Sequence, residues 1–463
     1  MELNNKKTLV VGLGVTGIAT SLFLKERGAR VTVSEQRNRE AIEPIIQQLS
    51  TRGIELELGT HRRETFTNAD LIIVSPGVPL DIPPLQAAHE RGVEIISEIE
   101  LAYRYIQKPI IAVTGTNGKT TTVNLIAEIF KAAGKKIFLG GNVGNPLIEY
   151  VLHRHDADYI IAEISSFQLE GIHTFKPFIS VLLNLHHDHL DRYASYSDYI
   201  AAKARLFINQ STGDYAVLNA DDPEIEKMAS ALNTTTLYFS CERKIPYGSY
   251  YENHHFYFTN GAAQTCLTFD HLYLQGNHNL HNIMAAVVVS KLCGCPQEKI
   301  QHAVEHFKGL PHRLEFLQEV NKIKFYNDSK ATNVSSVVRA LEALTPPIIL
   351  IAGGKDKGGD YHPLTPLIKE KVKTLILLGE ATEKMSQAFQ TATPIILAET
   401  LEEAFRRALE QASPGDTILL SPACSSFDMF ADYKERGNVF KRLVTSHAHT
   451  LHKGIHDGTT QNI

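Results

Sequence analysis

The 463-residue chain has few cysteines, little net charge and no long apolar run. Its five cysteines are odd in number and form no CxxC pair, which excludes a disulfide framework and favours a reducing compartment. Lys and Arg (46) nearly balance Asp and Glu (51), so the formal charge of −5 argues against a nucleic-acid or membrane-surface partner. Because no apolar segment qualifies as a signal peptide or a membrane span, we expect a cytoplasmic protein with no membrane contact.

The composition is that of a globular protein that can bury large cores, with 43% hydrophobic and 21% charged residues. At about 150 residues per domain, the length predicts roughly three domains. Breaks at YIQKP (105–109) and GLPHR (309–313) place the boundaries, so we expect domains at 1–107, 108–309 and 310–446. Residues 447–463 hold four histidines among polar residues, and we expect a disordered tail there rather than a metal site.

Short β-branched runs alternate with helical patterns along the whole chain, which is typical of parallel α/β sheets. The clearest predicted strands cover residues 8–12, 30–34, 71–75, 110–113, 136–139, 159–162, 179–185, 322–326, 348–352, 374–378, 394–397 and 417–420. Helices are predicted at 16–26, 119–133 and 281–293, and a small hairpin within 238–275.

The first glycine-rich turn, GLGVTG (12–17), lies between a predicted strand and helix, with Glu35 at the end of the next strand. This pattern matches the dinucleotide fingerprint, in which glycines let a pyrophosphate approach the helix N-terminus and the acid binds a ribose. Alone it suggests a nicotinamide dehydrogenase. The diphosphate of any nucleotide would suit the same geometry, and a tight turn without a ligand is a further alternative.

The second glycine-rich turn, TGTNGKTT (114–121), is the stronger signal because it joins a buried strand to a helix. Backbone N–H groups of such a loop cradle phosphates, while Lys119 neutralises charge and Thr120 is suited to Mg²⁺. The loop departs from the GxxxxGK[ST] consensus because Val113 occupies the position of the first glycine.

Two strand ends downstream carry further candidate ligands. Glu163 ends an apolar strand, which is where a Mg²⁺ ligand beside a phosphate loop belongs. The run HHDHLD (186–191) suggests a zinc hydrolase, but it contains no HExxH pattern and strand-tip side chains point to different sides. We interpret His186 and His187 as solvated loop residues.

These motifs together resemble the Mur ligases and their folylpolyglutamate synthase relatives. The resemblance is carried by GTNGKTT, AEISSFQLE, LNLHHDHLDRY, the lysine of YIAAKARLF, VLNADDP, GNHNLHN, GLPHR and NDSKATN. Within the family, GLGVTG, SPGVP (75–79) and LLSPACSSFDMF (419–430) are similar to the members that add D-glutamate. The resemblance extends from about residue 8 to 445 and leaves only the tail outside.

The resemblance implies an α/β fold with a Rossmann-like N-terminal domain, a central P-loop-type ATPase domain and a Rossmann-like C-terminal domain. It implies a monomeric, ATP-dependent amide ligase of peptidoglycan precursor synthesis. That enzyme would join D-glutamate to UDP-N-acetylmuramoyl-L-alanine through an acyl phosphate, so the first glycine-rich turn would bind UDP rather than NAD.

Other interpretations remain. Another Mur ligase or a folylpolyglutamate synthase-like enzyme would share the central motifs, although the latter needs no diphosphate-binding domain before its phosphate loop. A nicotinamide dehydrogenase would leave GTNGKTT, Glu163 and NDSKATN without a role. A non-catalytic ATP-binding switch would release no ADP in response to an amino acid.

The resemblance also assigns residues to each ligand. ATP is assigned to Gly115, Thr116, Asn117, Gly118, Lys119, Thr120, Thr121, Asn279, Asn282, Arg313 and Asp328. Two Mg²⁺ sites are assigned to Thr120, Glu163, His189 and a carbamylated Lys203, and catalytic roles to Lys119, Glu163, His189, Lys203 and Lys330. The UDP-substrate is assigned to Gly14, Val15, Thr16, Glu35, Arg37, Ser75 and Asn142. D-Glutamate is assigned to Thr332, Lys357, Ser426, Phe427 and Tyr433.

Two of these assignments involve a departure or a choice. Tyr433 stands where the family pattern leads us to expect Phe, and Lys355 offers a second lysine beside Lys357. Carbamylation of Lys203 has a physical purpose, because an ammonium would repel Mg²⁺ whereas a carbamate supplies an anionic oxygen.

Overall fold

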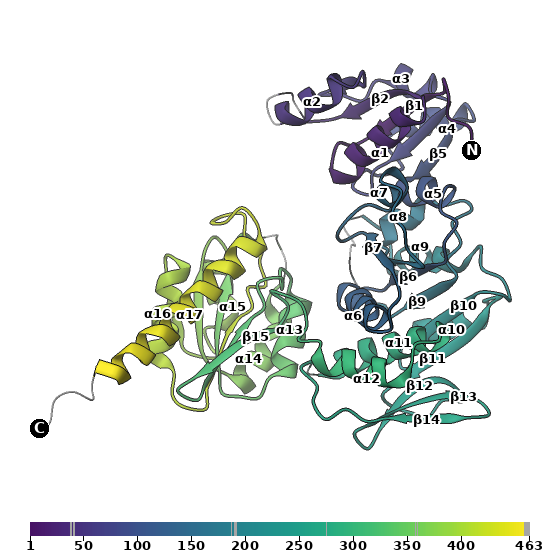
Figure 1. The fold of residues 1–463 in the computed structure, drawn as a ribbon. Helices are drawn as coiled ribbons and strands as arrows, with labels where there is room; N and C mark the ends of the chain where they lie inside the picture. Colours follow the sequence, from purple (N-terminus) through teal and green to yellow (C-terminus); the bar gives the residue numbers. More distant parts are fainter. Residues whose placement is uncertain are drawn as a thin grey trace, which may run out of the picture. The chain divides into compact units, whose positions relative to one another are not determined.

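The computed structural model describes residues 1–457 except 38, 40, 41, 187, 189–191, 275, 357 and 359, and the side chains as far as residue 449. The chain forms three sheets flanked by helices (Figure 1). It divides into two compact units, one comprising residues 1–272 with 278–307 and the other 273–277 with 308 onward. The predicted α/β class is confirmed.

The first sheet is fully parallel, with strand order β3-β2-β1-β4-β5. Its strands are β1 (Lys7–Val11), β2 (Arg30–Glu35), β3 (Glu55–Leu58), β4 (Leu71–Val74) and β5 (Glu94–Ser97). Its helices are α1 (Val15–Glu26), α2 (Glu43–Ser50), α3 (Arg63–Thr67), α4 (Pro83–Glu90) and α5 (Glu98–Tyr103). Strand order reverses at β1, between β2 and β4, and such a switch point opens a crevice at the carboxyl ends of the strands.

The central sheet has nine strands in the order β14-β13-β12-β11-β10-β9-β6-β8-β7. The strands are β6 (Ile110–Thr114), β7 (Ile137–Gly141), β8 (Tyr159–Glu163), β9 (Ile179–Leu182), β10 (Tyr215–Asn219), β11 (Thr235–Ser240), β12 (Tyr247–Glu252), β13 (His255–Asn260) and β14 (Gln264–Leu267). The helices are α6 (Lys119–Ala132), α7 (Leu147–Leu152), α8 (Ser166–Glu170), α9 (Tyr196–Ala204), α10 (Pro223–Ala229), α11 (Asn277–Leu292) and α12 (Gln297–His306).

Strand β6 is buried along its whole length, as expected for an apolar run inside a parallel sheet. The predicted hairpin is present, since β12 and β13 pair antiparallel, and it extends this sheet. Strand β12 pairs parallel with β11, and β13 and β14 follow antiparallel.

The third sheet has the order β15-β16-β20-β17-β18-β19. Its strands are β15 (Glu315–Val320), β16 (Ile323–Asn327), β17 (Ile348–Gly353), β18 (Val372–Leu378), β19 (Ile395–Leu397) and β20 (Thr417–Leu420). Its helices are α13 (Val334–Ala343), α14 (Thr365–Lys371), α15 (Thr382–Phe389), α16 (Leu401–Gln411) and α17 (Tyr433–Asp457). Strand β15, which is half-exposed and paired antiparallel with β16 at the sheet edge, was not predicted from the sequence.

The tail differs from the sequence prediction. Helix α17 continues to Asp457, so residues 447–457 are helical rather than disordered. The physical reason is visible at His447, whose ring packs 6.3 Å from that of Phe325 and 6.2 Å from that of Phe405. These contacts show that the helix is still packed on the third sheet at His447, the first residue past the predicted boundary. Residues 458–463 lie outside the described chain. Among the described residues, no helix is long and apolar enough to cross a membrane.

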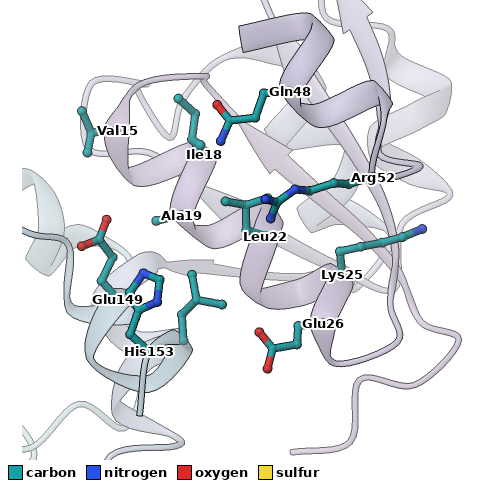
Figure 2. Close-up of a pocket in the computed structure, with 11 residues that line it drawn as sticks. Val15, Ile18, Ala19, Leu22, Lys25, Glu26, Gln48, Arg52, Glu149 and His153 are labelled. Atoms are coloured by element: carbon teal, nitrogen blue, oxygen red, sulfur yellow. The ribbon is translucent and has the colours of Figure 1, made fainter. Parts of the chain in front are cut away.

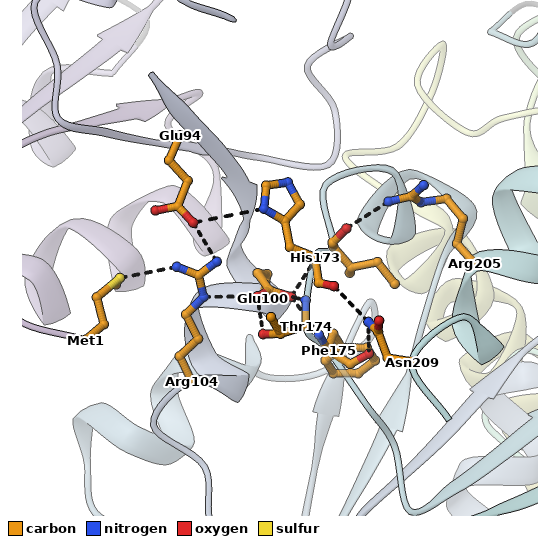
Figure 3. A network of polar contacts seen from close by, with 10 residues as sticks. Met1, Glu94, Glu100, Arg104, His173, Thr174, Phe175, Arg205 and Asn209 are labelled. Carbon is orange, nitrogen blue, oxygen red and sulfur yellow. Dashed lines mark hydrogen bonds and ion pairs between the residues drawn. The ribbon is translucent and has the colours of Figure 1, made fainter. Parts of the chain in front are cut away.

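The first and central sheets are joined by a buried carboxylate, Glu100 (Figure 3). Its Oε2 accepts hydrogen bonds from three successive backbone N–H groups, those of His173, Thr174 and Phe175, at 2.8–2.9 Å. Its Oε1 accepts from the Thr174 hydroxyl at 2.6 Å and from Arg104 at 3.0 Å. Burial alone would raise the pKa of Glu100, but these donors stabilise the anion and the pKa is lowered.

A second buried carboxylate on the same helix, that of Glu98, has far fewer hydrogen-bond donors around it. Its Oε1 accepts the Ile148 N–H at 2.6 Å, while Oε2 has no hydrogen-bond partner among the described residues. Burial disfavours the charged form and raises the pKa of Glu98 to about 7, with a smaller contribution from the charge of Glu149. The group is therefore easier to protonate in the folded chain than in the unfolded chain.

We predict that Glu98→Gln makes the folded state less sensitive to pH. Because the pKa of Glu98 is higher in the folded chain, its protonation stabilises the folded state. This stabilisation is fully present below pH 4.5 and is lost as the pH rises through about 7. The variant, which cannot ionise, should gain stability relative to wild type across this window, by at most about 3 kcal/mol. Urea-unfolding midpoints at pH 4.5 and 8 measure the difference. Glu90→Gln, at an exposed position of α4, is the control and should show no such gain.

Candidate active site

The loop between β6 and α6 has a shape that requires two of its glycines. Gly115 has a φ of +145° and Gly118 a φ of +85°, both in the region that L-residues rarely adopt. A Cβ on Gly115 would crowd Leu183, and one on Gly118 would collide with Asn282 Oδ1. The backbone therefore passes close to β9 and α11, and its N–H groups line the start of α6 as phosphate binding requires.

Asn184, which follows β9, fixes the loop from one side. Its Oδ1 accepts the Asn117 N–H at 2.9 Å, its Nδ2 donates to the Asn117 carbonyl at 3.1 Å, and its own carbonyl accepts the Thr116 N–H at 2.9 Å. This residue was not predicted from the sequence. Its position at the end of a strand beside the loop was the available signal.

The first helical residue after the loop, Lys119, bends back over it. Its Nζ donates to the carbonyls of Gly115 at 2.8 Å and Thr116 at 2.9 Å. The predicted cation is thus at the phosphate loop. Thr120 and Thr121 follow in the first turn of α6, and both are buried.

Helix α11 approaches the other side of the loop. Asn282 Oδ1 accepts from the Thr122 hydroxyl at 3.2 Å, and Asn282 Nδ2 donates to Asn279 Oδ1 at 3.1 Å. The structure thus brings Asn282 against the first turn of α6, with Asn279 hydrogen-bonded to it.

Glu163 ends β8, the strand directly beside β6, and its side chain is buried. Its Oε1 accepts from Asn142 Nδ2 at 2.9 Å, while Oε2 has no hydrogen-bond partner within the described part of the chain. A buried carboxylate oxygen with no donor is a suitable ligand for a hard cation. Asn142, predicted to bind the UDP-substrate, therefore lies against Glu163 at the central sheet rather than beside the first sheet.

Lys203, on α9, is 2% exposed and donates to the Gly115 carbonyl at 3.1 Å. Burial and the nearby charge of Lys119 lower the pKa of Lys203 well below its usual value, against the opposing charges of Asp188 and Glu163. The charged form of this amine is thus less favourable than that of an exposed lysine. His189, predicted to share this site, lies outside the described residues.

Tyr199 supports Lys203 from one helical turn earlier. Its ring lies 4.7 Å from Lys203 Nζ and its hydroxyl is 3.1 Å from Thr116 Oγ1. This residue too was not predicted, although the i, i+4 spacing within YIAAK places it on the same helix face as the lysine.

The predicted diphosphate turn lies at the β1 switch point of the first sheet, and Glu35 stabilises it. Glu35 Oε2 accepts the Leu13 N–H at 2.7 Å, and Oε1 accepts the Arg37 N–H at 2.9 Å. Burial opposes ionisation, but hydrogen bonds from Arg37 and Leu13 outweigh it and lower the pKa of Glu35 to about 2. Ser75 donates to the Gly12 carbonyl at 3.1 Å and ties the SPGVP loop to the turn.

Gly14, Val15 and Thr16 form the N-terminal end of α1, where Gly14 and Val15 are exposed. Val15 also borders a cavity of about 880 Å³ between α1, α7 and the end of α2 (Figure 2). No other residue that we assign to a substrate lines it. Glu149 of α7 and His153, the residue that follows α7, face α1 across this space.

In the second unit, Asp328 is buried at the end of β16. It accepts from the Leu314 N–H at 3.0 Å and from the Ser421 hydroxyl at 2.8 Å. Burial raises the pKa of Asp328 to about 7, although Ser421, Leu314 and the charge of Arg313 oppose the shift. The residue thus connects the Arg313 loop to the end of β20.

The residues assigned to D-glutamate and catalysis in this unit form two groups. Lys330 Nζ lies 4.0 Å from the centre of the Tyr433 ring, and the Thr332 N–H donates to the Lys330 carbonyl at 2.8 Å. Ser426 is 2% exposed, whereas its neighbour Phe427 is 66% exposed. Lys357 lies outside the described residues, and the nearby Lys355 N–H donates to the Ser425 carbonyl at 2.9 Å.

Arg436, which was not predicted from the sequence, holds these two loops together. Its guanidinium donates to the carbonyls of Ser329 at 2.9 Å, Cys424 at 3.1 Å and Ser425 at 3.2 Å. Because it is 3% exposed, burial lowers its pKa to about 10. It positions the Lys330 and Ser426 segments relative to each other.

Known protein families match the sequence in all three parts of the chain. Residues 6–97 match the MurD-like N-terminal domain of Mur ligases, 113–290 the Mur ligase middle domain and 312–424 the glutamate ligase domain. The chain belongs to the Mur ligase family, and the predicted fold class is confirmed.

Curated relatives are named UDP-N-acetylmuramoylalanine–D-glutamate ligase. One from Geotalea uraniireducens is 51% identical, covering 96% of this chain and 98% of its own. One from Pelobacter propionicus is 50% identical, covering 96% and 99%.

Solved structures share the fold at lower identity. The ligase MurC of Thermotoga maritima is 19% identical with a TM-score of 0.58, covering 96% of this chain and 100% of its own. A pseudomurein peptide ligase type C of Methanothermus fervidus is 21% identical with a TM-score of 0.59, with the same coverage.

We predict that Gly118→Ala lowers the thermal unfolding midpoint more than Gly134→Ala does. These glycines stand at the two ends of α6, both with positive φ, and each substitution carries a left-handed cost of about 1 kcal/mol. Only at Gly118 would the new Cβ also displace Asn282, since nothing lies within 4 Å of one at Gly134. Calorimetry of the two variants measures the contact with α11. Equal losses would show that this contact does not constrain the loop.

Proposed function

We propose that this protein is an ATP-dependent ligase that joins D-glutamate to UDP-N-acetylmuramoyl-L-alanine in peptidoglycan precursor synthesis. The observation that carries the proposal is the 51% identity, over 96% of the chain, with a relative of that name. The phosphate loop, with a buried acid and a buried lysine beside it, supports the same reaction. The proposed substrates are small molecules made in the cytoplasm, and we assign the enzyme to that compartment as a monomer.

We infer that ATP binds at the β6–α6 loop. Residues 115–121 would hold its phosphates through backbone N–H groups and Lys119, with Asn279 and Asn282 beside them. The third sheet would contribute Arg313 and Asp328. We propose domains at 1–107, 108–309 and 310–446, so that each of the three sheets contributes one substrate site.

The residues beside the loop fit Mg²⁺. Glu163 offers a buried carboxylate oxygen with no hydrogen-bond partner among the described residues, and Thr120 offers a hydroxyl at the start of α6. We propose two metal sites, one at Thr120 and Glu163 and the other at Lys203 with His189. When bound, the metal would neutralise charge on the phosphates during transfer.

We propose that Lys203 is carbamylated. Its amine is buried, has a lowered pKa because of that burial and the charge of Lys119, and shares the Gly115 carbonyl with Lys119. A neutral amine is the form that adds CO₂, and the product replaces a second cation with an anionic oxygen ligand. Tyr199 would hold the modified side chain in place from the same face of α9.

We propose that the reaction has two chemical steps. The carboxylate of the alanyl group attacks the γ-phosphorus of ATP, which gives an acyl phosphate and releases ADP. The amine of D-glutamate then attacks the acyl carbon, and phosphate leaves as the amide forms. Lys119 and Lys330 would offset negative charge during both steps, and alignment of the reactants would supply much of the remaining acceleration.

The acceptor would bind at the β1 switch point. Gly14, Val15 and Thr16 offer the N-terminal end of α1 to a diphosphate, as helix N-termini favour anions. Arg37 and Ser75 flank the turn, and Glu35 acts mainly by holding its shape. Asn142, beside Glu163, would contact the end of the acceptor that reacts.

D-Glutamate would bind at the third sheet. Thr332, Ser426, Phe427 and Tyr433 would surround it, with Lys357 as the cation for its side-chain carboxylate. A diamino acid would instead place an ammonium group next to that lysine, at a cost of several kcal/mol when partly desolvated. The hydroxyl of Tyr433, in place of the expected Phe, leaves this preference unchanged.

We predict that Lys203→Ala is nearly inactive and partly rescued by acetate or formate. A small carboxylate can occupy the place of the missing carbamate oxygen, although it has a binding cost that the tethered group avoids. Phosphate release with and without the anion measures the rescue. Lys227→Ala, at a surface position of α10, should stay fully active. Full activity of Lys203→Ala would exclude the carbamate.

We predict a strong preference for D-glutamate over L-glutamate, lysine and diaminopimelate, with UDP-N-acetylmuramoyl-L-alanine as the required acceptor. Phosphate release across this panel is the measurement. Lys357→Ala should raise the KM for D-glutamate by roughly tenfold or more, equivalent to about 1.4 kcal/mol, and leave the KM for ATP little changed. Lys355→Ala serves as the matched control. Equal use of diaminopimelate, or glutamylation of a folate, would assign the chain to another branch of the family.

A further inference from the structure

Away from the phosphate loop, three potential metal ligands of different chemistry meet between β10, β11 and α11. Asp221 follows β10, Cys241 follows β11, and His281 lies in the second turn of α11. One carboxylate oxygen, the thiol sulfur and one imidazole nitrogen all lie within 4.8 Å of one another. Neither the proposed reaction nor the proposed substrates use this cluster.

The cluster is held in place before any ion binds. Asp221 Oδ2 lies 2.8 Å from His281 Nε2 and also accepts the Cys241 N–H at 2.6 Å. Asp221 Oδ1 accepts from the Ser240 hydroxyl at 2.5 Å. The hydrogen bonds from the Ser240 hydroxyl and the Cys241 N–H orient the carboxylate, and loss of such supporting bonds typically weakens metal binding 10- to 100-fold.

The three side chains are largely buried but remain accessible to solvent. The Asp221 side chain is 5% exposed and that of His281 22%, while Cys241 is half-buried. An ion could therefore reach them from solvent. Arg243 brings a positive charge to the neighbourhood, but its guanidinium is paired with Glu226 and with the Ala220 carbonyl.

We propose that Asp221, Cys241 and His281 form a binding site for Zn²⁺, with a water molecule as the fourth ligand. Sulfur and imidazole nitrogen select zinc, whereas Mg²⁺ prefers oxygen ligands. With zinc–ligand bonds of about 2.0–2.3 Å, tetrahedral ligands stand roughly 3.3–3.8 Å apart. The Asp221 Oδ2–His281 Nε2 distance of 2.8 Å would widen as the ion enters, and the other separations, at most 4.8 Å, would close by no more than about 1–1.5 Å. The Cys241 proton and any proton on His281 Nε2 leave to solvent as the ion binds.

The site has a structural consequence because His281 is adjacent in the chain to a residue of the phosphate-loop region. That neighbour, Asn282, contacts Thr122 in the first turn of α6. A bound ion would link α11 to the ends of β10 and β11. It would thereby stabilise the position of α11, which contacts the phosphate-loop region through Asn282. The alternative is that Asp221 and His281 form only an ion pair. Such a pair would also link β10 to α11, but more weakly, and it would not need Cys241.

Titration of the full-length protein with Co²⁺, in Mg²⁺-containing buffer, tests the proposal. Cobalt stands in for zinc, and a thiolate ligand gives a near-ultraviolet charge-transfer band that oxygen and histidine ligands do not give. We expect one such band per chain, removed by stoichiometric Zn²⁺. The band should be absent in Cys241→Ser and retained in Cys266→Ser, the matched variant at an exposed cysteine of β14.

Two further variants keep the result decisive if Cys241→Ser folds poorly. His281→Gln and Asp221→Asn should each weaken Co²⁺ binding by about 100-fold. Zn²⁺ should raise the thermal midpoint of wild type and of Cys266→Ser, but not of His281→Gln. A wild-type protein without the band, or a band that persists in Cys241→Ser, would overturn the proposal.

Discussion

The shape of the β6–α6 loop is the constraint on which the rest of the site depends. The loop is compressed between Asn184 on one side and Asn282 on the other, and only glycine fits at the two points of closest approach. Because the loop is already held, its N–H groups need not be ordered when phosphate arrives. Preorganisation of this kind lowers the entropic cost of binding.

The fixed shape of the loop also brings two lysine amines close together. Lys119 and Lys203 both donate to the Gly115 carbonyl, so two amines share one acceptor inside the protein. Their mutual repulsion, together with burial, disfavours a second positive charge. Beside these two amines, Glu163 has a buried carboxylate oxygen without a hydrogen-bond partner among the described residues.

Local pattern predicted the elements well where the chain alternates between buried strands and short loops. The strand 417–420 and the start of α6 at Lys119 agree with the structure, because apolar runs and glycine turns are local signals. Strand β15 was missed because it is a half-exposed edge strand without a continuous apolar run. The end of α17 was missed because its contacts are with residues far away in the sequence. Asn184, Tyr199 and Arg436 were missed for the same reason. Family resemblance assigned ligands, whereas residues that position those ligands are visible only in three dimensions.

The Glu100 network limits where the chain could be cut to exchange its first sheet for that of another family member. Three backbone N–H groups from residues 173–175 converge on a carboxylate that lies after the last strand of the first sheet. Arg104 and Tyr105 reach back from the same segment to Glu94 and Met1. A chimera cut at Ser97 would separate α5 from one set of partners or the other. The natural junction for recombination with another family member therefore lies after Tyr105, and α5 must travel with the first sheet, accompanied by a matching 173–175 turn.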